Sequence, residues 1–384
     1  MNSNERLLTA FRGGTPDRVP VSPWISLRMF EVITGKSPKQ FLDEFVEDPG
    51  NSVIKIQEDL GLDPILITFQ EFEDEVVDWP KRYLQWAPQA FENWKVETEI
   101  SDREGNNYTV HRTITTPRGK LTSAYRAERY QKWTSEYLIK DESDLELLKY
   151  RPDPKYLDVS RLAELVRKVG KRGTVLHNFQ GAWYDACTLR GLVTVSMDIY
   201  DRPDWLHRYM ETISDYLERL LAKVLESGLE VILLDQSWVG AGLSPKVFNE
   251  FILPQDQRLI RLIHGKRVIV DYHNCGRVTA LLEAMAATGA DVLEPLTPPV
   301  LNGDIELADA KKRVGKNTAL YGAFNERVLS SDNPDDVVQE VHRCIDAGAH
   351  GGGYAIRGAG QIFDAKLKNI ELMSKEVARY GSYK

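Results

Sequence analysis

The sequence has few cysteines, no long apolar run and no excess of positive charge. Its three cysteines are too few and too scattered for a disulfide framework. No apolar stretch approaches the roughly 18 residues that a membrane-spanning helix needs, and residues 1–6 lack the pattern of a signal peptide. The net charge of −8 argues against binding to nucleic acid or to an anionic membrane. We therefore expect a cytoplasmic protein.

Two motif classes are also absent. Gly351-Gly352-Gly353 precedes a predicted strand and does not open a helix, so it is neither a dinucleotide fingerprint nor a phosphate-binding loop. No serine lies in a nucleophile-elbow pattern.

Short apolar, β-branched runs alternate with longer helical patterns, which is typical of βα units around a parallel sheet. The predicted strands are residues 19–21, 64–69, 174–179, 231–235, 267–272, 291–294, 318–322 and 353–356. This pattern predicts an α/β fold, a closed TIM (β/α)₈ barrel, with residues 1–384 as a single domain. An open doubly wound sheet is the alternative.

Helix signals support this pattern in the second half. Arg202-Pro203-Asp204 starts a long helix before Gly228, and Ser244-Pro245 supplies an N-cap and a first-turn proline for a helix that ends near Gly265. One segment, residues 78–141, reads instead as β-hairpins with one polar face. We expect this segment to be an insertion between the second and third barrel strands, folded over one barrel mouth.

Polar and aromatic residues are concentrated at the C-terminal ends of the predicted strands, where barrel enzymes hold their reactive groups. Candidates for substrate contact are Trp24, Arg28, Asn178, Tyr184, Gln236, Trp238, Tyr321, Asn325 and Arg357. Asp235 is a candidate catalytic acid or base, or else an orienting or N-capping carboxylate. The aromatic members could line a pocket for a flat substrate or simply pack at the mouth. The arginines could grip a carboxylate or pair with surface acids.

A possible metal site follows the fifth predicted strand. His273 and Cys275 are two residues apart, so both side chains can point the same way from one strand end. Imidazole and thiolate are zinc ligands. Glu294 ends the next strand and could be a third ligand, leaving an open fourth position for catalysis. A buried cysteine beside a hydrogen-bonded histidine, with Glu294 as a cap or ion-pair residue, is the alternative.

Several segments resemble the uroporphyrinogen decarboxylase superfamily. They are RLLTAFRG at 6–13, PDRVPV at 16–21, LSP at 243–245, FILP at 251–254, HNCG at 273–276, GADVLEP at 289–295 and GDIEL at 303–307. The resemblance implies a TIM barrel with a deep cleft at its C-terminal mouth. The true decarboxylases carry an Arg-Gln-Ala-Gly-Arg motif after the first strand, whereas this chain has WISLRMF at 24–30.

The His-x-Cys pattern is similar to that of the cobalamin-dependent methyltransferase branch, in which His, Cys and a later Cys hold zinc. The resemblance implies zinc at His273 and Cys275. The later cysteine has no counterpart in IRGAG at 356–360. Either Glu294 completes the site, or zinc binding is weakened or lost.

Three functions follow as hypotheses. The first is methyl transfer between a small methylated substrate and the cobalamin cobalt of a separate corrinoid protein; methylated phenols, amines, thiols and methanol are candidates, and the aromatic residues favour aryl methyl ethers. The second is a metal-free decarboxylase or lyase that uses Asp235. The third is a small-molecule-binding barrel without turnover. A homodimer is expected only from base rates.

Overall fold

The structure of the protein is a computed structural model that describes residues 1–69, 83–105, 107–128 and 132–383. Its centre is a seven-stranded parallel sheet with strand order β1-β8-β9-β10-β11-β12-β13. The strands are β1 (Ile65–Phe69), β8 (Thr174–Gln180), β9 (Val231–Asp235), β10 (Ile269–His273), β11 (Val292–Glu294), β12 (Ala319–Tyr321) and β13 (Tyr354–Ala355). Chain order and spatial order agree around the curved sheet, as in a TIM barrel.

The segment at residues 19–21 stands between the two edges of this sheet. Val21 forms an isolated parallel bridge with Ile356, and the amide of Ile356 donates to the carbonyl of Pro20 at 2.8 Å. On the other side, the amide of Asp63 donates to the carbonyl of Val21 at 2.8 Å. The first predicted strand is therefore a bridged segment rather than a full strand, and the predicted TIM-barrel fold is confirmed.

Side-chain alternation divides the apolar residues into two cores. Val231, Leu233 and Ile269 point into the barrel, where they pack with Leu7 and Phe11 of α1 (Ser3–Phe11). Because these strand residues lie at or near the strand starts, α1 covers the N-terminal end of the barrel. Residues of opposite parity pack outward against the helices in the larger core. The parity of a strand residue therefore fixes whether it faces the barrel interior.

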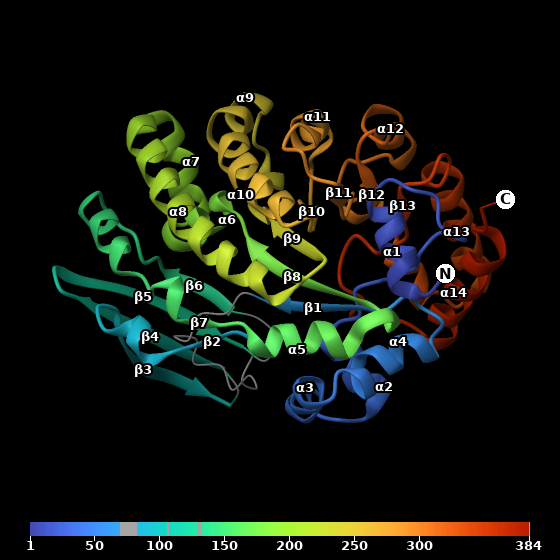
Figure 1. Ribbon diagram of the computed structural model, residues 1–384, viewed down its shortest axis with the longest axis horizontal. Helices are drawn as coiled ribbons and strands as arrows, with labels where there is room; N and C mark the ends of the chain where they lie inside the picture. The colour runs from blue at the N-terminus through green and yellow to red at the C-terminus, as the bar shows by residue number, and fades with distance from the viewer. Residues whose placement is uncertain (70–82, 106, 129–131, 384) are drawn as a thin grey trace.

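Helices surround the sheet (Figure 1). They are α2 (Leu27–Thr34), α3 (Pro38–Glu47), α4 (Lys55–Asp59), α5 (Ser160–Val169), α6 (Ala182–Arg190), α7 (Leu192–Asp201), α8 (Pro203–Val224), α9 (Pro245–Val247), α10 (Leu253–Gly265), α11 (Leu282–Ala286), α12 (Leu307–Arg313), α13 (Pro334–Gly348) and α14 (Leu367–Tyr380). The predicted starts are confirmed: α8 has Pro203 in its first turn, and Ser244 accepts a hydrogen bond from the amide of Val247 at 3.3 Å. Within the described part of the chain, no helix is both long and apolar enough for a membrane span.

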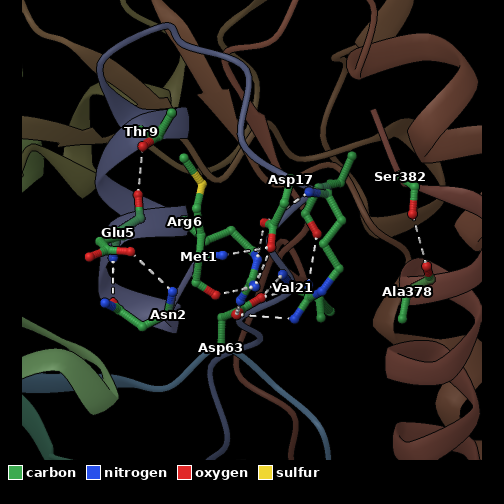
Figure 2. A network of polar contacts seen from close by, with 12 residues as sticks. Met1, Asn2, Glu5, Arg6, Thr9, Asp17, Val21, Asp63, Ala378 and Ser382 are labelled. Carbon is green, nitrogen blue, oxygen red and sulfur yellow. Dashed lines mark hydrogen bonds and ion pairs between the residues drawn. The ribbon is translucent and has the colours of Figure 1, made fainter. Parts of the chain in front are cut away.

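Buried charges fasten the barrel near its N-terminal end (Figure 2). The Asp63 carboxylate accepts hydrogen bonds from Arg6 Nη1 at 2.6 Å, from Arg18 Nη1 at 2.8 Å and from the amide of Val21 at 3.0 Å. Arg6 also binds Asp17 at 2.6 Å. Asp63 therefore joins α1, the first segment and the start of β1 through one fully buried carboxylate.

A four-stranded antiparallel sheet lies in the chain between β1 and β8. Its strands are β3 (Lys95–Glu104), β4 (Asn107–Thr116), β5 (Gly119–Ala127) and β6 (Lys132–Glu136), in that spatial order. A two-stranded pair, β2 (Gln85–Trp86) with β7 (Leu157–Asp158), flanks it in sequence. In Figure 1 the four-stranded sheet lies at the left, far from α1, α13 and α14 at the right. Residues 78–82, 106 and 129–131 of the predicted insertion lie outside the described residues.

Candidate active site at the barrel mouth

Strand register brings three candidate residues to one level of the barrel. His273 ends β10 opposite Asp235 on β9 and opposite Glu294 on β11. All three share the parity of the interior residues of their strands, so they face the barrel interior at its C-terminal mouth. They are at most 9% exposed, and Glu294 is fully buried. These strand ends therefore assemble an imidazole and two carboxylates within the barrel.

Glu294 stands between His273 and Arg357. One carboxylate oxygen contacts His273 Nδ1, and the other forms an ion pair with Arg357 Nη1. Among the described residues, no three His, Cys, Asp or Glu side chains are arranged to hold a metal ion. Both oxygens of Glu294 are thus engaged, one with the imidazole of His273 and the other with the guanidinium of Arg357.

Cys275 lies just beyond the end of β10 and is partly buried. Burial would raise the pKa of its thiol, but the hydrogen bond and charge of His273, with a hydrogen bond from Ser237, hold that pKa below its ordinary value. By contrast, burial raises the pKa of Cys344 to about 12 and also raises that of Cys187. Cys275 is thus the cysteine suited to nucleophilic or metal-ligand chemistry.

Asp235 is held in place by its neighbours. Asn178 Nδ2 donates to Asp235 Oδ2 at 3.0 Å, while the amide of Ser237 donates to Oδ1 at 2.9 Å and its hydroxyl to the same oxygen at 2.5 Å. These donors fix the orientation of the carboxylate. Asn178 and Asp235, both predicted from sequence, therefore act as a pair.

Arg357 lies beneath the mouth, between two aromatic rings. Its guanidinium carbon is 5.2 Å from the ring centroid of Trp24 and 5.4 Å from that of Tyr321. Burial lowers the pKa of Arg357 to about 10, although nearby negative groups, including Asp271, oppose this shift. Arg357 is 1% exposed and pairs with Glu294 through Nη1, whereas its Nε and Nη2 lack a hydrogen-bond partner among the described residues.

Several predicted contact residues have structural roles. Gln236 is fully buried and faces α10, where its Nε2 donates to Asp256 Oδ1 at 2.6 Å. Asn325 caps a short 3₁₀ helix by accepting from the amide of Arg327 at 3.2 Å. Arg28 is exposed near the start of α2. Among the described residues, none of these three side chains forms a hydrogen bond or ion pair with the side chains of Asp235, His273 or Glu294.

The aromatic candidates lie at two depths. Tyr321 is buried, and its hydroxyl donates to the carbonyl of Ser22 at 2.6 Å, so it ties the first segment to β12. Tyr184 and Trp238 lie higher, with ring centroids 6.1 Å apart. Trp238 is 40% exposed. Tyr184 and Trp238, with Trp24, are thus the candidate rings for substrate contact.

Two further residues join the site. Ser237 contacts both Asp235 and Cys275, and Asp271 lies one interior position below His273. Both oxygens of Asp271 lack a hydrogen-bond partner among the described residues, and burial raises its pKa to about 7 against the opposing charges of Arg357 and His273. The two-residue spacing of Asp271 from His273 within β10 is the sequence signal that identifies it, whereas Ser237 begins the 3₁₀ helix that follows β9.

Asp256 supports the mouth from outside the barrel. It accepts hydrogen bonds from Tyr272 at 2.5 Å and from Gln236, whose Oε1 accepts from the amide of Tyr184 at 3.0 Å. Burial raises the pKa of Asp256 to about 7, while these two hydrogen bonds oppose the rise. The folded state therefore keeps a proton that the unfolded chain releases near 3.8, the ordinary pKa of an aspartate.

We predict that Asp256→Asn will flatten the dependence of stability on pH. A raised folded-state pKa stabilises the fold at low pH, and this contribution is lost as pH rises toward 7. Between pH 5 and 8 the free energy of unfolding of the parent should fall by about 2–3 kcal/mol more than that of the variant. Urea titrations at both pH values measure the difference; Asp201→Asn, at the exposed end of α7, is the control. Parallel pH profiles for the parent and Asp256→Asn would contradict the prediction.

Comparisons with known proteins agree with this architecture. The family model described as "Uroporphyrinogen decarboxylase (URO-D)" matches residues 133–380. Uroporphyrinogen decarboxylase of Methylibium petroleiphilum is 30% identical over 235 residues, 58% of each chain. That of Neisseria meningitidis serogroup C (strain 053442) is 30% identical over 166 residues, 42% of this chain and 44% of the relative. This chain thus spans about half the length of the curated relatives it matches.

Solved structures show the same fold. A methyltransferase from Methanosarcina mazei superposes with a TM-score of 0.66 over 99% of both chains, at 15% identity. A B12-independent methionine synthase from Shewanella sp. W3-18-1 gives a TM-score of 0.50 at 10% identity, over 94% of this chain and 96% of the other.

Proposed function

Because this chain belongs to the uroporphyrinogen decarboxylase (URO-D) family, we propose that its barrel mouth is an active site. The reaction proposed is methyl transfer between a small methylated substrate and the cobalt of a separate corrinoid protein. The observation that carries the proposal is the His273–Cys275 pair, in which the thiol pKa is held below its ordinary value and the imidazole contacts a carboxylate. The fold likeness to a methyltransferase agrees with it.

His273 and Cys275 are the residues that would hold zinc. An imidazole nitrogen and a thiol sulfur from one strand end suit this cation. A ligating histidine commonly has its other ring nitrogen bound to a carboxylate, as Glu294 binds Nδ1 here. Bound zinc would lower the pKa of a substrate heteroatom or polarise a methylated donor. Among the described residues no third His, Cys, Asp or Glu side chain is arranged with this pair to hold a metal ion, so water or substrate would fill the remaining positions.

The other mouth residues would bind and orient the substrate. Asp235, fixed by Asn178 and Ser237, presents an acceptor beside Cys275. Trp24 and the Tyr184–Trp238 pair offer ring faces to a flat substrate, which favours aryl methyl ethers among the candidates. Arg357 and Glu294 neutralise each other below the site, and the buried pair keeps the imidazole in one orientation.

The rim of the mouth offers a surface for the corrinoid protein. Exposed apolar side chains follow four different strands: Phe69 at the end of β1, Trp238 after β9, Val300 after β11 and Phe363 after β13. Apolar groups from four loops around one opening favour docking of a protein partner over bulk water. We propose that the corrinoid protein docks here and brings its cobalt to the substrate.

The function is tested by incubating purified protein with methylated phenols, amines, thiols and methanol together with cob(I)alamin. Methyl transfer changes the cobalt absorption spectrum, and metal analysis of the same protein measures zinc. We expect methylcobalamin from at least one donor and about one zinc per chain. Zinc bound without transfer from any donor class, in either direction, would instead support a binding protein without turnover.

A metal-free lyase is the second candidate. The incomplete ligand set among the described residues favours it, with Asp235 as the acid or base. In this case metal analysis gives near-zero zinc in the parent and in His273→Ala alike. Decarboxylation of a carboxylated substrate would then replace methyl transfer as the measured reaction.

Glu294→Gln distinguishes an orienting role from a ligand role. A glutamine can still accept from His273 Nδ1, but it lacks the negative charge that raises the basicity of the imidazole. We predict that zinc affinity and kcat/KM will fall about 10- to 100-fold while binding remains measurable. Titration with a zinc chelator gives the affinity. Complete loss of zinc in a folded variant would identify Glu294 as a direct ligand.

A further inference from the structure

Two loops at the barrel mouth contact each other through glycine. The first follows β9 and forms the 3₁₀ helix Ser237–Ala241, whose fourth residue is Gly240. The second follows β10 and contains Cys275 and Gly276. A Cβ atom added to Gly240 would lie 1.8 Å from the carbonyl oxygen of Cys275, closer than Cβ atoms come to other atoms in proteins. This contact therefore requires a residue without a side chain at position 240.

The backbone conformation of Gly240 does not itself require glycine. Gly240 lies outside the positive-φ region, whereas Gly276, on the other side of the contact, has a φ of 92°. A Cβ atom added to Gly276 would lie 3.2 Å from the carbonyl oxygen of Gly240. The close approach of the two backbones, and not a left-handed turn, is thus the reason for glycine at position 240.

A hydrogen bond holds the start of the same loop on β10. The amide of Gln236 donates to the carbonyl of His273 at 2.9 Å. The next residue, Ser237, donates through its hydroxyl to Asp235 at 2.5 Å and also forms a hydrogen bond with Cys275. The loop after β9 is therefore fixed to the end of β10 on both sides of the Ser237 hydroxyl, at residue 236 and at residue 240.

We propose that Gly240 is a positioning residue that sets the place of the Cys275 thiol, because it lets the Ser237–Ala241 helix pack directly on the Cys275 backbone. The inference rests on the function proposed above, in which Cys275 would bind zinc. Gly240 acts through the carbonyl group of Cys275 and not on the substrate. A side chain at position 240 would separate the two loops by about 1 Å or more, and displacements of this size are large for a reactive group.

Gly240→Ala tests the proposal in the full chain. Zinc affinity, measured by titration with a chelator, should fall about 10- to 100-fold, as when groups that orient a metal ligand are lost. The value of kcat/KM for methyl transfer to cob(I)alamin should fall about 10²-fold. Both effects follow from the displacement of Cys275 relative to His273.

A third measurement needs neither zinc nor turnover. Cys187 and Cys344 are buried, so iodoacetamide should react with Cys275 in the metal-free protein, and peptide mass spectrometry locates the product. In Gly240→Ala the reaction at neutral pH should slow about tenfold, because the thiol loses its hydrogen bonds with His273 and Ser237. Slower alkylation together with an absence of methyl transfer in the parent would refute the proposed function and still support the positioning role.

Gly173→Ala is the matched control for a backbone clash away from the site. Gly173 precedes β8, and a Cβ atom there would lie 2.5 Å from the carbonyl oxygen of Pro64, at the opposite end of the barrel. This variant should be less stable than the parent in urea, but its zinc affinity and its rate of Cys275 alkylation should be unchanged. A general loss of stability would therefore not imitate the expected result.

Gly276→Ala is the second variant if Gly240→Ala does not fold. It presses on the same contact by only a few tenths of an ångström, with added strain from its positive φ, so zinc affinity and alkylation should fall in the same direction by smaller factors. Parent values of zinc affinity and alkylation rate in a folded Gly240→Ala or Gly276→Ala would overturn the proposal. Equal losses in Gly173→Ala would overturn it too.

Discussion

Under the function proposed above, we predict that a Cys275→Ser variant will keep its fold but show about 10³-fold or more lower methyl transfer and bind little zinc. A serine hydroxyl keeps its proton where the Cys275 thiol, aided by His273 and Ser237, releases it more readily. Oxygen is also a poorer partner than sulfur for zinc beside an imidazole. The measurements are kcat/KM for transfer to cob(I)alamin and zinc per chain.

Cys187→Ala is the matched control for this result. Cys187 is buried in α6, and burial raises the pKa of its thiol, so it has no part in the proposed chemistry. Its replacement should leave kcat/KM and zinc content as in the parent. Full activity of Cys275→Ser would remove the thiol from the mechanism.

Asp63→Ala will lower the free energy of unfolding by about 3–5 kcal/mol. The substitution removes the acceptor for two guanidinium groups and for the amide of Val21. Arg6 is 8% exposed and keeps only its contacts with Asp17 and a backbone carbonyl. The positive charge left near the base of the barrel then lacks its buried counter-charge, which is why the loss exceeds that of a surface ion pair.

Urea unfolding at neutral pH measures this difference. The control is Asp59→Ala in α4, whose carboxylate is 62% exposed and pairs with Lys55 one turn away. That replacement should leave the free energy of unfolding nearly unchanged, because water screens an exposed pair. Similar losses in both variants would show that the Asp63 cluster does not fasten the barrel.

The barrel could be predicted from sequence because its strands are short, buried and followed by distinct helix signals. Ser244-Pro245 and Arg202-Pro203 mark helix starts through local chemistry alone. The segment at residues 19–21 could not be predicted as a bridge rather than a strand. Its position depends on Asp63 and Ile356, which are distant in sequence.

From the sequence, the alternation of side chains along each strand predicts only which candidate residues face the barrel interior. Asp235, His273 and Glu294 face inward as their two-residue spacing from apolar interior residues requires. Gln236 has the opposite parity, which places it behind the strand, against Asp256. The contacts of Glu294 with Arg357 arise across the barrel, so no local pattern in the sequence predicts them.

The ion pairs that hold the first segment in the barrel affect how this protein can acquire new substrate specificities. The carboxylate at the base is bound to two guanidinium groups and to backbone, all remote from the rim loops. Mutations that exchange rim side chains therefore leave the closure of the cylinder intact. Evolution can thus change which molecule binds at the barrel mouth while the same buried ion pairs keep the barrel closed.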